Sequence, residues 1–319
     1  MLTDWYSSFL FVCICMKILV LFDQFSGEGV PSKMTKEHAV EIFTKQGFNV
    51  LELQFDSNTI YADLLKIKPD VVFNAMHGKF GEDGRLQGLL DIMKIKYTHD
   101  NHFVSSIGFN KNYTKSLMES VGVPVANGVL LNRYDILSGE YLQNDLTKKD
   151  YIIKPNCNGS TLGLCIRAGE KRGLKIIEND LSGDDEFLLE EFIPGREFAV
   201  LVYNKTIIGA TELVSNGTEN IISYSDKYVD ICDRPAPCID DKILNKLYEY
   251  SLLINNKINA NALARIDFRV NNDKIAALEI NTHPGLGKKS MVANIYNHNK
   301  LNINDLFENL VLNAKYNAY

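Results

Sequence analysis

Several features that would assign a function at once are missing from the sequence. It has no run of basic residues and its formal net charge is −6, so the composition argues against a nucleic-acid-binding protein. Its six cysteines form no C-x-x-C pair, and none has a histidine at zinc-finger spacing. Scattered cysteines in a chain of this length favour a reducing compartment. No internal repeat is evident.

A long hydrophobic run is also missing. Residues 9–15 are apolar, but this stretch is too short to span a bilayer. Asp4 stands where a signal peptide would carry lysine or arginine, and no small-residue cleavage site follows. Met16 and Lys17 look like a second natural start, with a first strand directly behind them. We therefore expect residues 1–15 to be an N-terminal extension, disordered or loosely docked, and we expect no membrane partner.

Length and patterning predict an α/β protein of several domains. The chain has 319 residues, 45% of them apolar, which is enough for two or three small domains. Within residues 16–100, strand patterns at 17–23, 49–55, 70–76 and near Tyr97 alternate with helix patterns at 33–46, 60–67 and 85–94. Such alternation predicts a mostly parallel sheet. Ligands of such sheets bind in loops after the strands, here 24–32 and 77–84.

The rest of the chain divides into two further predicted units with α+β character. Residues 101–188 contain a helix at 111–121 and strands at 151–154 and 164–167, joined by a glycine-rich loop. The unit at 189–319 contains strands at 197–203 and 206–213, a polar segment at 215–237, a helix at 240–257, a hairpin and a C-terminal helix at 304–315. Long polar segments inside compact domains are usually functional or disordered. We expect 215–237 to act as a lid loop.

The hairpin, within residues 262–281, carries the strongest chemical signal. Two apolar runs, 262–270 and 275–280, flank four polar residues, which is typical of a β-hairpin. Alternation places Arg265 and Asp267 on one face of the first strand, and Glu279 and Asn281 on one face of the second. If the strands pair, two carboxylates and an amide oxygen converge, a ligand set that Mg²⁺ prefers. The alternative is a solvated hairpin whose charges only maintain solubility.

Three other segments add to this signal. Residues 154–163, KPNCNGSTLG, combine a lysine with glycines that let backbone N–H groups approach phosphate. They lack the G-K-[ST] of a Walker A loop, and the alternative is a tight β-turn. Residues 188–197, LLEEFIPGRE, lead a strand into an acidic turn, alternatively a hinge. Pro284 and Gly285 turn the chain and leave a backbone N–H to face a ligand.

Together these segments resemble ATP-grasp ligases. R-x-D, a hairpin, E-x-N and P-G are similar to the metal-binding hairpin of that superfamily. The strings E-I-N-T-x-P-G at 279–285 and H-G-x-x-G-E-D-G at 77–84 resemble the D-alanine–D-alanine ligases, and the resemblance runs from about Met16 to the C-terminus. It implies a three-domain ATP-grasp fold with an N-terminal parallel-sheet domain. It also implies a cytoplasmic homodimer that joins two D-alanines through an acyl phosphate for peptidoglycan synthesis, using ATP and two Mg²⁺ ions, for which Mn²⁺ can substitute.

The resemblance implies roles for residues around the nucleotide. The lysines that would contact its phosphates are Lys111, Lys154 and, at the terminal phosphate, Lys227. The residues that would surround adenosine are Glu190, Glu191, Ile193 and, at the ribose hydroxyls, Glu197. The metal ligands would be Asp267, Glu279 and Asn281.

The resemblance also implies roles at the first amino acid. Glu28 would anchor the ammonium of the first D-alanine, and His77 would lie beside this substrate. Ser160 and Tyr228 would link with Glu28 to close the lid loop over the site.

Four residues would act at the bond being made and at the second amino acid. Arg265 and the N–H of Gly285 would stabilise the tetrahedral oxyanion. Ser290, with Met291 beside it, would contact the carboxylate of the second amino acid.

Two alternatives stay open. The loop around Glu28 lacks the paired glycines and second acid usual in the family, and Gly287-Lys288-Lys289 replaces a threonine-containing run. These departures favour an ATP-grasp ligase for a different amino-acid pair or a hydroxy acid, although Tyr228 favours an amine acceptor. The other alternative is a nucleotide-binding homologue with little catalysis, against which the intact lysines and metal set argue.

Overall fold

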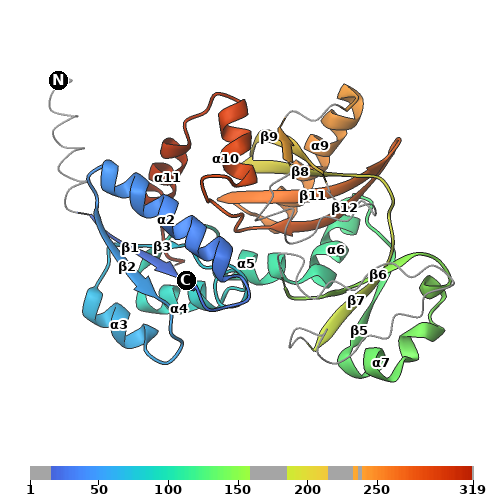
Figure 1. The fold of residues 1–319 in the computed structure, drawn as a ribbon, viewed down its shortest axis with the longest axis horizontal. Coiled ribbons are helices and arrows are strands. Elements are labelled where there is room, and N and C mark those ends of the chain that lie inside the picture. Colours follow the sequence, from blue (N-terminus) through green and yellow to red (C-terminus); the bar gives the residue numbers. More distant parts are fainter. Residues whose placement is uncertain (1–15, 159–184, 215–232, 236–238, 318–319) are drawn as a thin grey trace.

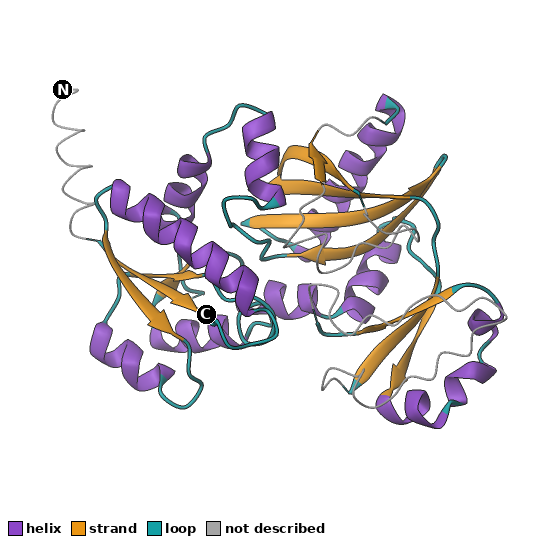
Figure 2. Cartoon of the chain, viewed as in Figure 1, coloured by secondary structure: helices purple, strands orange, loops and turns teal. Residues whose placement is uncertain are grey.

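The structure is a computed structural model that describes residues 16–158, 185–214, 233–235 and 239–317 (Figure 1). Three sheets, of four, three and five strands, make up its β-structure, and helices pack around them (Figure 2). The expected N-terminal extension and the strand at 164–167 lie outside the described residues. So do Ser160, Lys227 and Tyr228.

The four-stranded sheet is parallel, with the strand order β2-β1-β3-β4. Its strands are β1 (Lys17–Phe22), β2 (Asn49–Gln54), β3 (Val71–Asn74) and β4 (Lys96–Tyr97), and its helices are α2 (Gly29–Lys45), α3 (Ile60–Ile67) and α4 (Arg85–Met93). The centre of β1 is fully buried, as expected for a parallel strand that is covered on both faces. The predicted parallel sheet is confirmed.

Helix α2 begins at Gly29 rather than at residue 33, so the predicted loop 24–32 is shorter than expected. Pro31 lies in the first turn, where a missing N–H leaves no hydrogen bond unmade. Glu28 is therefore the N-cap residue of α2, and the helix fixes its position.

The three-stranded sheet is antiparallel, with the order β5-β7-β6. Its strands are β5 (Gly128–Asn132), β6 (Tyr151–Pro155) and β7 (Glu186–Glu191); the helices nearby in sequence are α5 (His102–Phe109), α6 (Lys111–Ser120) and α7 (Arg133–Ser138), followed by 3₁₀ turns at Glu140–Gln143 and Asp145–Lys148. Strand β7 spans the predicted domain boundary between residues 188 and 189. Helices α5 and α7 and strand β5 were not predicted.

The five-stranded sheet is antiparallel, with the order β10-β9-β8-β11-β12. Its strands are β8 (Arg196–Tyr203), β9 (Thr206–Leu213), β10 (Asp233–Pro235), β11 (Leu263–Asn271) and β12 (Lys274–Asn281), with helices α9 (Asp241–Ile258), α10 (Met291–His298) and α11 (Ile303–Leu312). Strand β10 lies inside the segment 215–237, so the prediction of a continuous loop there was wrong. Helix α10 was also not predicted.

The two ends of the chain share one hydrophobic core. Phe307 of α11 packs against Phe43 of α2 and Phe73 of β3, with ring centroids 5.8 and 5.6 Å apart, and all three rings are fully buried. Leu286, which follows β12, belongs to the same core. Figure 1 shows α10 and α11 beside α2. This packing holds the loops after β1 and β3 against the segment after β12. No described helix combines the length and the apolar character needed to cross a membrane.

Candidate active site

The hairpin of β11 and β12 aligns four polar residues on one face of the sheet. Arg265 pairs with Asn281, and Asp267 pairs with Glu279. Residues directly opposite in an antiparallel pair point to the same side. The predicted hairpin is therefore confirmed, and its register brings Asp267, Glu279 and Asn281 to one face as expected, with Arg265 on the same face. A β-bulge follows between Asp267 and Phe268.

Asp267 is held in a fixed orientation by its neighbour on the same strand. Arg265 donates two hydrogen bonds to its carboxylate, Nε to Oδ1 at 2.7 Å and Nη2 to Oδ2 at 2.8 Å, and Asp267 is 1% exposed. Each oxygen keeps a further lone pair. The side chain of Glu279 is more exposed than that of Asp267. The Oδ1 atom of Asn281 accepts a hydrogen bond from the backbone N–H of His283 at 2.7 Å. Two carboxylates and an amide on rigid strands fit Mg²⁺ by the chemistry of their oxygens.

Lys111 lies next to this face, at the first turn of α6. Its Nζ is 3.5 Å from Oε2 of Glu279, and it also donates to the carbonyl of Asn158. A small cavity of about 30 Å³ is lined by these three residues together with Asn281. The structure thus brings a predicted phosphate-binding lysine to two predicted metal ligands.

A second lysine site is built around Glu190 of β7. Lys154 of β6 lies 2.7 Å from one carboxylate oxygen of Glu190, and Lys115 of α6 pairs with the other. Burial alone would raise the pKa of Glu190, but the two lysines outweigh it and hold the pKa below its usual value. Burial would lower the pKa of Lys154, but nearby carboxylates, Glu190 foremost, keep it above its usual value. Both members of the pair are therefore charged.

The remaining residues predicted to surround adenosine lie on β7, β8 and the segment between them. The Glu191 carboxylate accepts from the backbone and side-chain N–H groups of Asn127, at 2.9 and 3.0 Å. Ile193 is partly exposed. Glu197, at the start of β8, is buried and lies 3.2 Å from the guanidinium of Arg269.

Glu28 and His77 come together at the ends of α2 and β3. Together with Glu82 they place one ligand atom each within 4.8 Å of one another. His77 Nδ1 is 2.9 Å from Glu82, and its Nε2 is 3.1 Å from the hydroxyl of Thr35. Because both ring nitrogens are engaged, this cluster is a hydrogen-bond network rather than a metal site.

The network continues to the segment after β12. The backbone N–H of Leu286 donates to Thr35 Oγ1 at 3.2 Å. Thr35 can then donate to Nε2 of His77, while Nδ1–H donates to Glu82, an assignment that satisfies every partner. His38 Nδ1 lies 2.7 Å from the carbonyl of Leu286. These bonds fix the orientation of His77 relative to Gly285.

The predicted oxyanion and second-substrate residues meet in one cavity. Arg265, Gly285, Ser290 and Met291 line a space of about 40 Å³ against α2. Ser290 is the N-cap of α10, and its Oγ accepts from the N–H of Ala293 at 3.2 Å. Its hydroxyl hydrogen remains available to a ligand.

The site also contains residues that had no predicted role, among them Lys115, Glu82 and Thr35. Lys115 lies four positions after Lys111 on α6, so helical spacing places both lysines on one face. This spacing could have pointed to Lys115 from the sequence. Glu82 lies within the quoted 77–84 motif. Thr35 bonds to Leu286 across 251 residues of sequence, and nothing local in the sequence points to that contact.

Comparison with known proteins agrees with this geometry. A family model described as D-ala D-ala ligase N-terminus matches residues 18–99, and one described as D-ala D-ala ligase C-terminus matches residues 117–312. A D-alanine–D-alanine ligase of Rhodospirillum rubrum is 32% identical over 307 residues, which cover 95% of this chain and 99% of the relative. One of Parvibaculum lavamentivorans is 33% identical, with 88% and 91% covered.

Solved structures share the fold. The D-alanine–D-alanine ligase of Bacillus anthracis complexed with ATP superposes with a TM-score of 0.77 at 21% identity, covering 93% of this chain and 96% of that one. The D-alanyl-alanine synthetase A of Vibrio cholerae gives 0.79 at 21% identity, covering 94% and 98%. The expected ATP-grasp fold is confirmed.

The Lys154–Glu190–Lys115 cluster predicts a specific stability change. Glu190→Gln removes the salt-bridge partner that Lys154 and Lys115 share, and we expect a loss of about 3–5 kcal/mol in the free energy of unfolding, measured by urea denaturation at neutral pH. Because the pKa of Glu190 is lowered by folding, its contribution in the wild type is present above the unfolded-state pKa and is lost as pH falls through the folded-state pKa. Glu249→Gln, which removes an exposed pair with Lys246, should change stability by less than about 0.5 kcal/mol. Equal stability of the two variants would contradict this account.

Proposed function

The chain belongs to the D-alanine–D-alanine ligase family, and we propose that it joins two D-alanines to D-alanyl-D-alanine for peptidoglycan synthesis, driven by ATP through an acyl phosphate. The observation that carries this proposal is the single face of β11 and β12. There Arg265, Asp267, Glu279 and Asn281 lie in register, with Lys111 beside Glu279. A phosphoryl-transfer site needs this combination of oxygen ligands and cations.

The nucleotide side of the reaction rests on charge neutralisation. Lys111 and Lys154 would face the phosphates, the segment Glu190–Ile193 would face adenine, and Glu197 would accept from the ribose hydroxyls. When bound, two Mg²⁺ ions held by Asp267, Glu279 and Asn281 would neutralise charge on the triphosphate.

The amino-acid side of the reaction follows from the network around α2. The Glu28 carboxylate would hold the ammonium of the first D-alanine beside His77. Attack by the second amine generates a tetrahedral oxyanion, which the guanidinium of Arg265 and the N–H of Gly285 would stabilise. Ser290, with Met291 beside it, would bind the carboxylate of the second D-alanine at the start of α10.

Phosphate release from ATP and Mg²⁺ tests the proposed reaction. We expect release that requires D-alanine, with one dipeptide formed for each phosphate. L-Alanine, D-lactate and D-serine serve as alternative substrates in parallel reactions. Equal or faster turnover with any of these would show that the altered loop around Glu28 has changed the specificity. Tight ATP binding without phosphate release from any substrate would instead identify a nucleotide-binding protein.

Glu279→Gln tests the metal ligands. The change removes one carboxylate but keeps size and fold, so we expect phosphate release to fall at least about 100-fold, consistent with the loss of several kcal/mol of charge stabilisation. The melting temperature should stay unchanged. Asp273→Asn, in the exposed turn of the same hairpin, is the matched control and should retain full activity. Retained turnover in Glu279→Gln would remove Glu279 from the metal set.

We further propose that the enzyme is a homodimer and acts in the cytoplasm, where its ATP is supplied. Exposed apolar side chains support a partner surface on two helices that pack together: Ile92 of α4 is 80% exposed and Phe103 lies on α5 at 62%. Light scattering should give twice the chain mass of 36.0 kDa. Ile92→Glu with Phe103→Glu should give the single-chain mass. A single-chain mass for the wild type at every concentration would rule the dimer out.

A further inference from the structure

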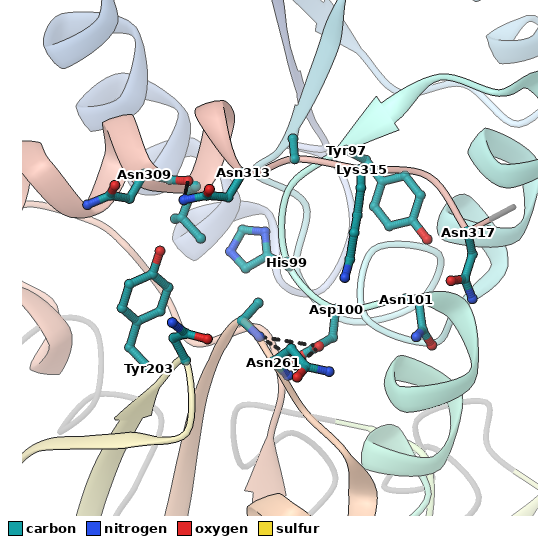
Figure 3. A pocket seen from close by; sticks show the side chains of 14 residues that line it. Tyr97, His99, Asp100, Asn101, Tyr203, Asn261, Asn309, Asn313, Lys315 and Asn317 are labelled. Carbon is teal, nitrogen blue, oxygen red and sulfur yellow. Dashed lines mark hydrogen bonds between the residues drawn. The ribbon is translucent and has the colours of Figure 1, made fainter.

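A cavity of about 390 Å³ lies apart from the candidate active site (Figure 3). It opens between the β4–α5 connection, the β8–β9 turn, the start of β11 and the chain after α11. None of the residues assigned above to ATP, metal or D-alanine lines it. It is therefore a separate space that the proposed reaction does not use.

The lining is polar and rich in amides. It includes two tyrosines, His99, one carboxylate and one ammonium group. The six asparagines of the lining are Asn101, Asn204, Asn261, Asn309, Asn313 and Asn317. Amides offer both donors and acceptors without charge, so this lining suits a small polar molecule and disfavours an apolar one.

One carboxylate, that of Asp100, and one ammonium group, that of Lys315, line the cavity. Asp100 is buried, and its carboxylate accepts from the backbone N–H of Asn261 at 2.8 Å and of Ala262 at 3.2 Å. Oδ1 accepts from both of these N–H groups, whereas Oδ2 accepts from Ala262 alone among the described residues and can accept a further hydrogen bond. In Figure 3 the side chain of Lys315 points into the cavity toward Asp100. Burial raises the pKa of Asp100 to about 6, although backbone hydrogen bonds and Lys315 oppose this shift.

The cavity is connected to the candidate active site by stacked histidines. His99 lines the cavity and stacks on His283 with ring centroids 3.7 Å apart; His283 meets His77 edge-on at 5.2 Å. His283 lies between Asn281 and Gly285 in the sequence. His99 has a φ of +73°, a conformation that non-glycine residues adopt rarely and at some cost in energy. Its Nε2 atom is buried without a hydrogen-bond partner among the described residues.

We propose that this cavity is a second binding site for a zwitterion of the amino-acid type, with the ligand's ammonium at Asp100 and its carboxylate at Lys315. A ligand of one charge sign would meet a like charge at Asp100 or at Lys315, whereas a zwitterion carries an opposite charge for each of them. Its occupancy changes turnover through the contacts of His99, His283 and His77. The binding itself does not depend on the proposed ligase reaction, but its effect on turnover does.

Equilibrium dialysis of the full-length protein with radiolabelled L-alanine tests the binding. Lys315→Gln and Asp100→Asn should each weaken the affinity for L-alanine at one class of binding sites, the cavity, by about tenfold. Each change removes one charged partner of the ligand. Lys315 is exposed, so its variant should fold even if Asp100→Asn does not. Lys300→Gln and Asp273→Asn, both exposed, are the matched controls and should bind as the wild type does.

Three results would overturn the site. One is that the wild-type protein binds none of L-alanine, glycine and glycylglycine at millimolar concentration. Another is unchanged L-alanine binding in both cavity variants. The third is binding of glucose without any of the zwitterions, because the cavity would then recognise a neutral polyol.

Initial rates of phosphate release test the coupling. With D-alanine varied, L-alanine should change the maximal rate at least twofold in the wild type, and this change should be absent in Lys315→Gln. His99→Gly, which its positive φ accommodates, should keep L-alanine binding but lose the rate effect. Purely competitive inhibition that persists in Lys315→Gln would place L-alanine in the active site and refute the coupling. Absence of any turnover would refute the ligase reaction instead and leave the dialysis result standing.

Discussion

The register between β11 and β12 is the constraint on which the candidate site depends. Side chains alternate along a strand, so a slip of one residue would turn Asp267 and Glu279 to opposite faces. The register is secured by burial, because every residue of β11 from Leu263 to Val270 is buried. The β-bulge lies between Asp267 and Phe268. The shift in pairing that it introduces therefore falls outside the Arg265–Asn281 and Asp267–Glu279 pairs and leaves them opposite each other.

A second requirement is that distant parts of the chain meet at this hairpin. Helix α2 is followed by more than two hundred residues before Leu286, yet Thr35 and His38 bind the backbone of Leu286 on both its N–H and its carbonyl. Phe307 of α11 packs on Phe43 of α2 and Phe73 of β3. This aromatic packing also holds the C-terminal part of the chain against α2. These contacts make the proposed amino-acid part of the site a product of tertiary packing, whereas the proposed metal ligands come from one local hairpin.

That difference explains what the sequence could predict. The hairpin, the parallel sheet and the helix α3 follow from periodicity, which is a local property. The start of α2 was misplaced because Gly29 and Pro31 are typical of loops, although both are tolerated in a first turn. The short helix α5 buries Ser105 and Gly108 but exposes Phe103, so its apolar residues do not follow an amphipathic period. The contact between Thr35 and Leu286 joins elements whose approach is set by the whole core, so no local pattern encodes it.

Glu190 also has a consequence for how the protein meets its nucleotide. With its carboxylate between Lys154 and Lys115, it acts as an internal counterion that is present before any phosphate arrives. The long lysine side chain is thereby ordered during folding, and its rotamer entropy is not lost again on binding. A phosphate bound at Lys154, as proposed above, would share this ammonium group with the Glu190 carboxylate. If Lys154 contacts phosphate as proposed, nucleotide association there would be an exchange between two anions around one ammonium group, with a weaker dependence on ionic strength than a bare lysine would give.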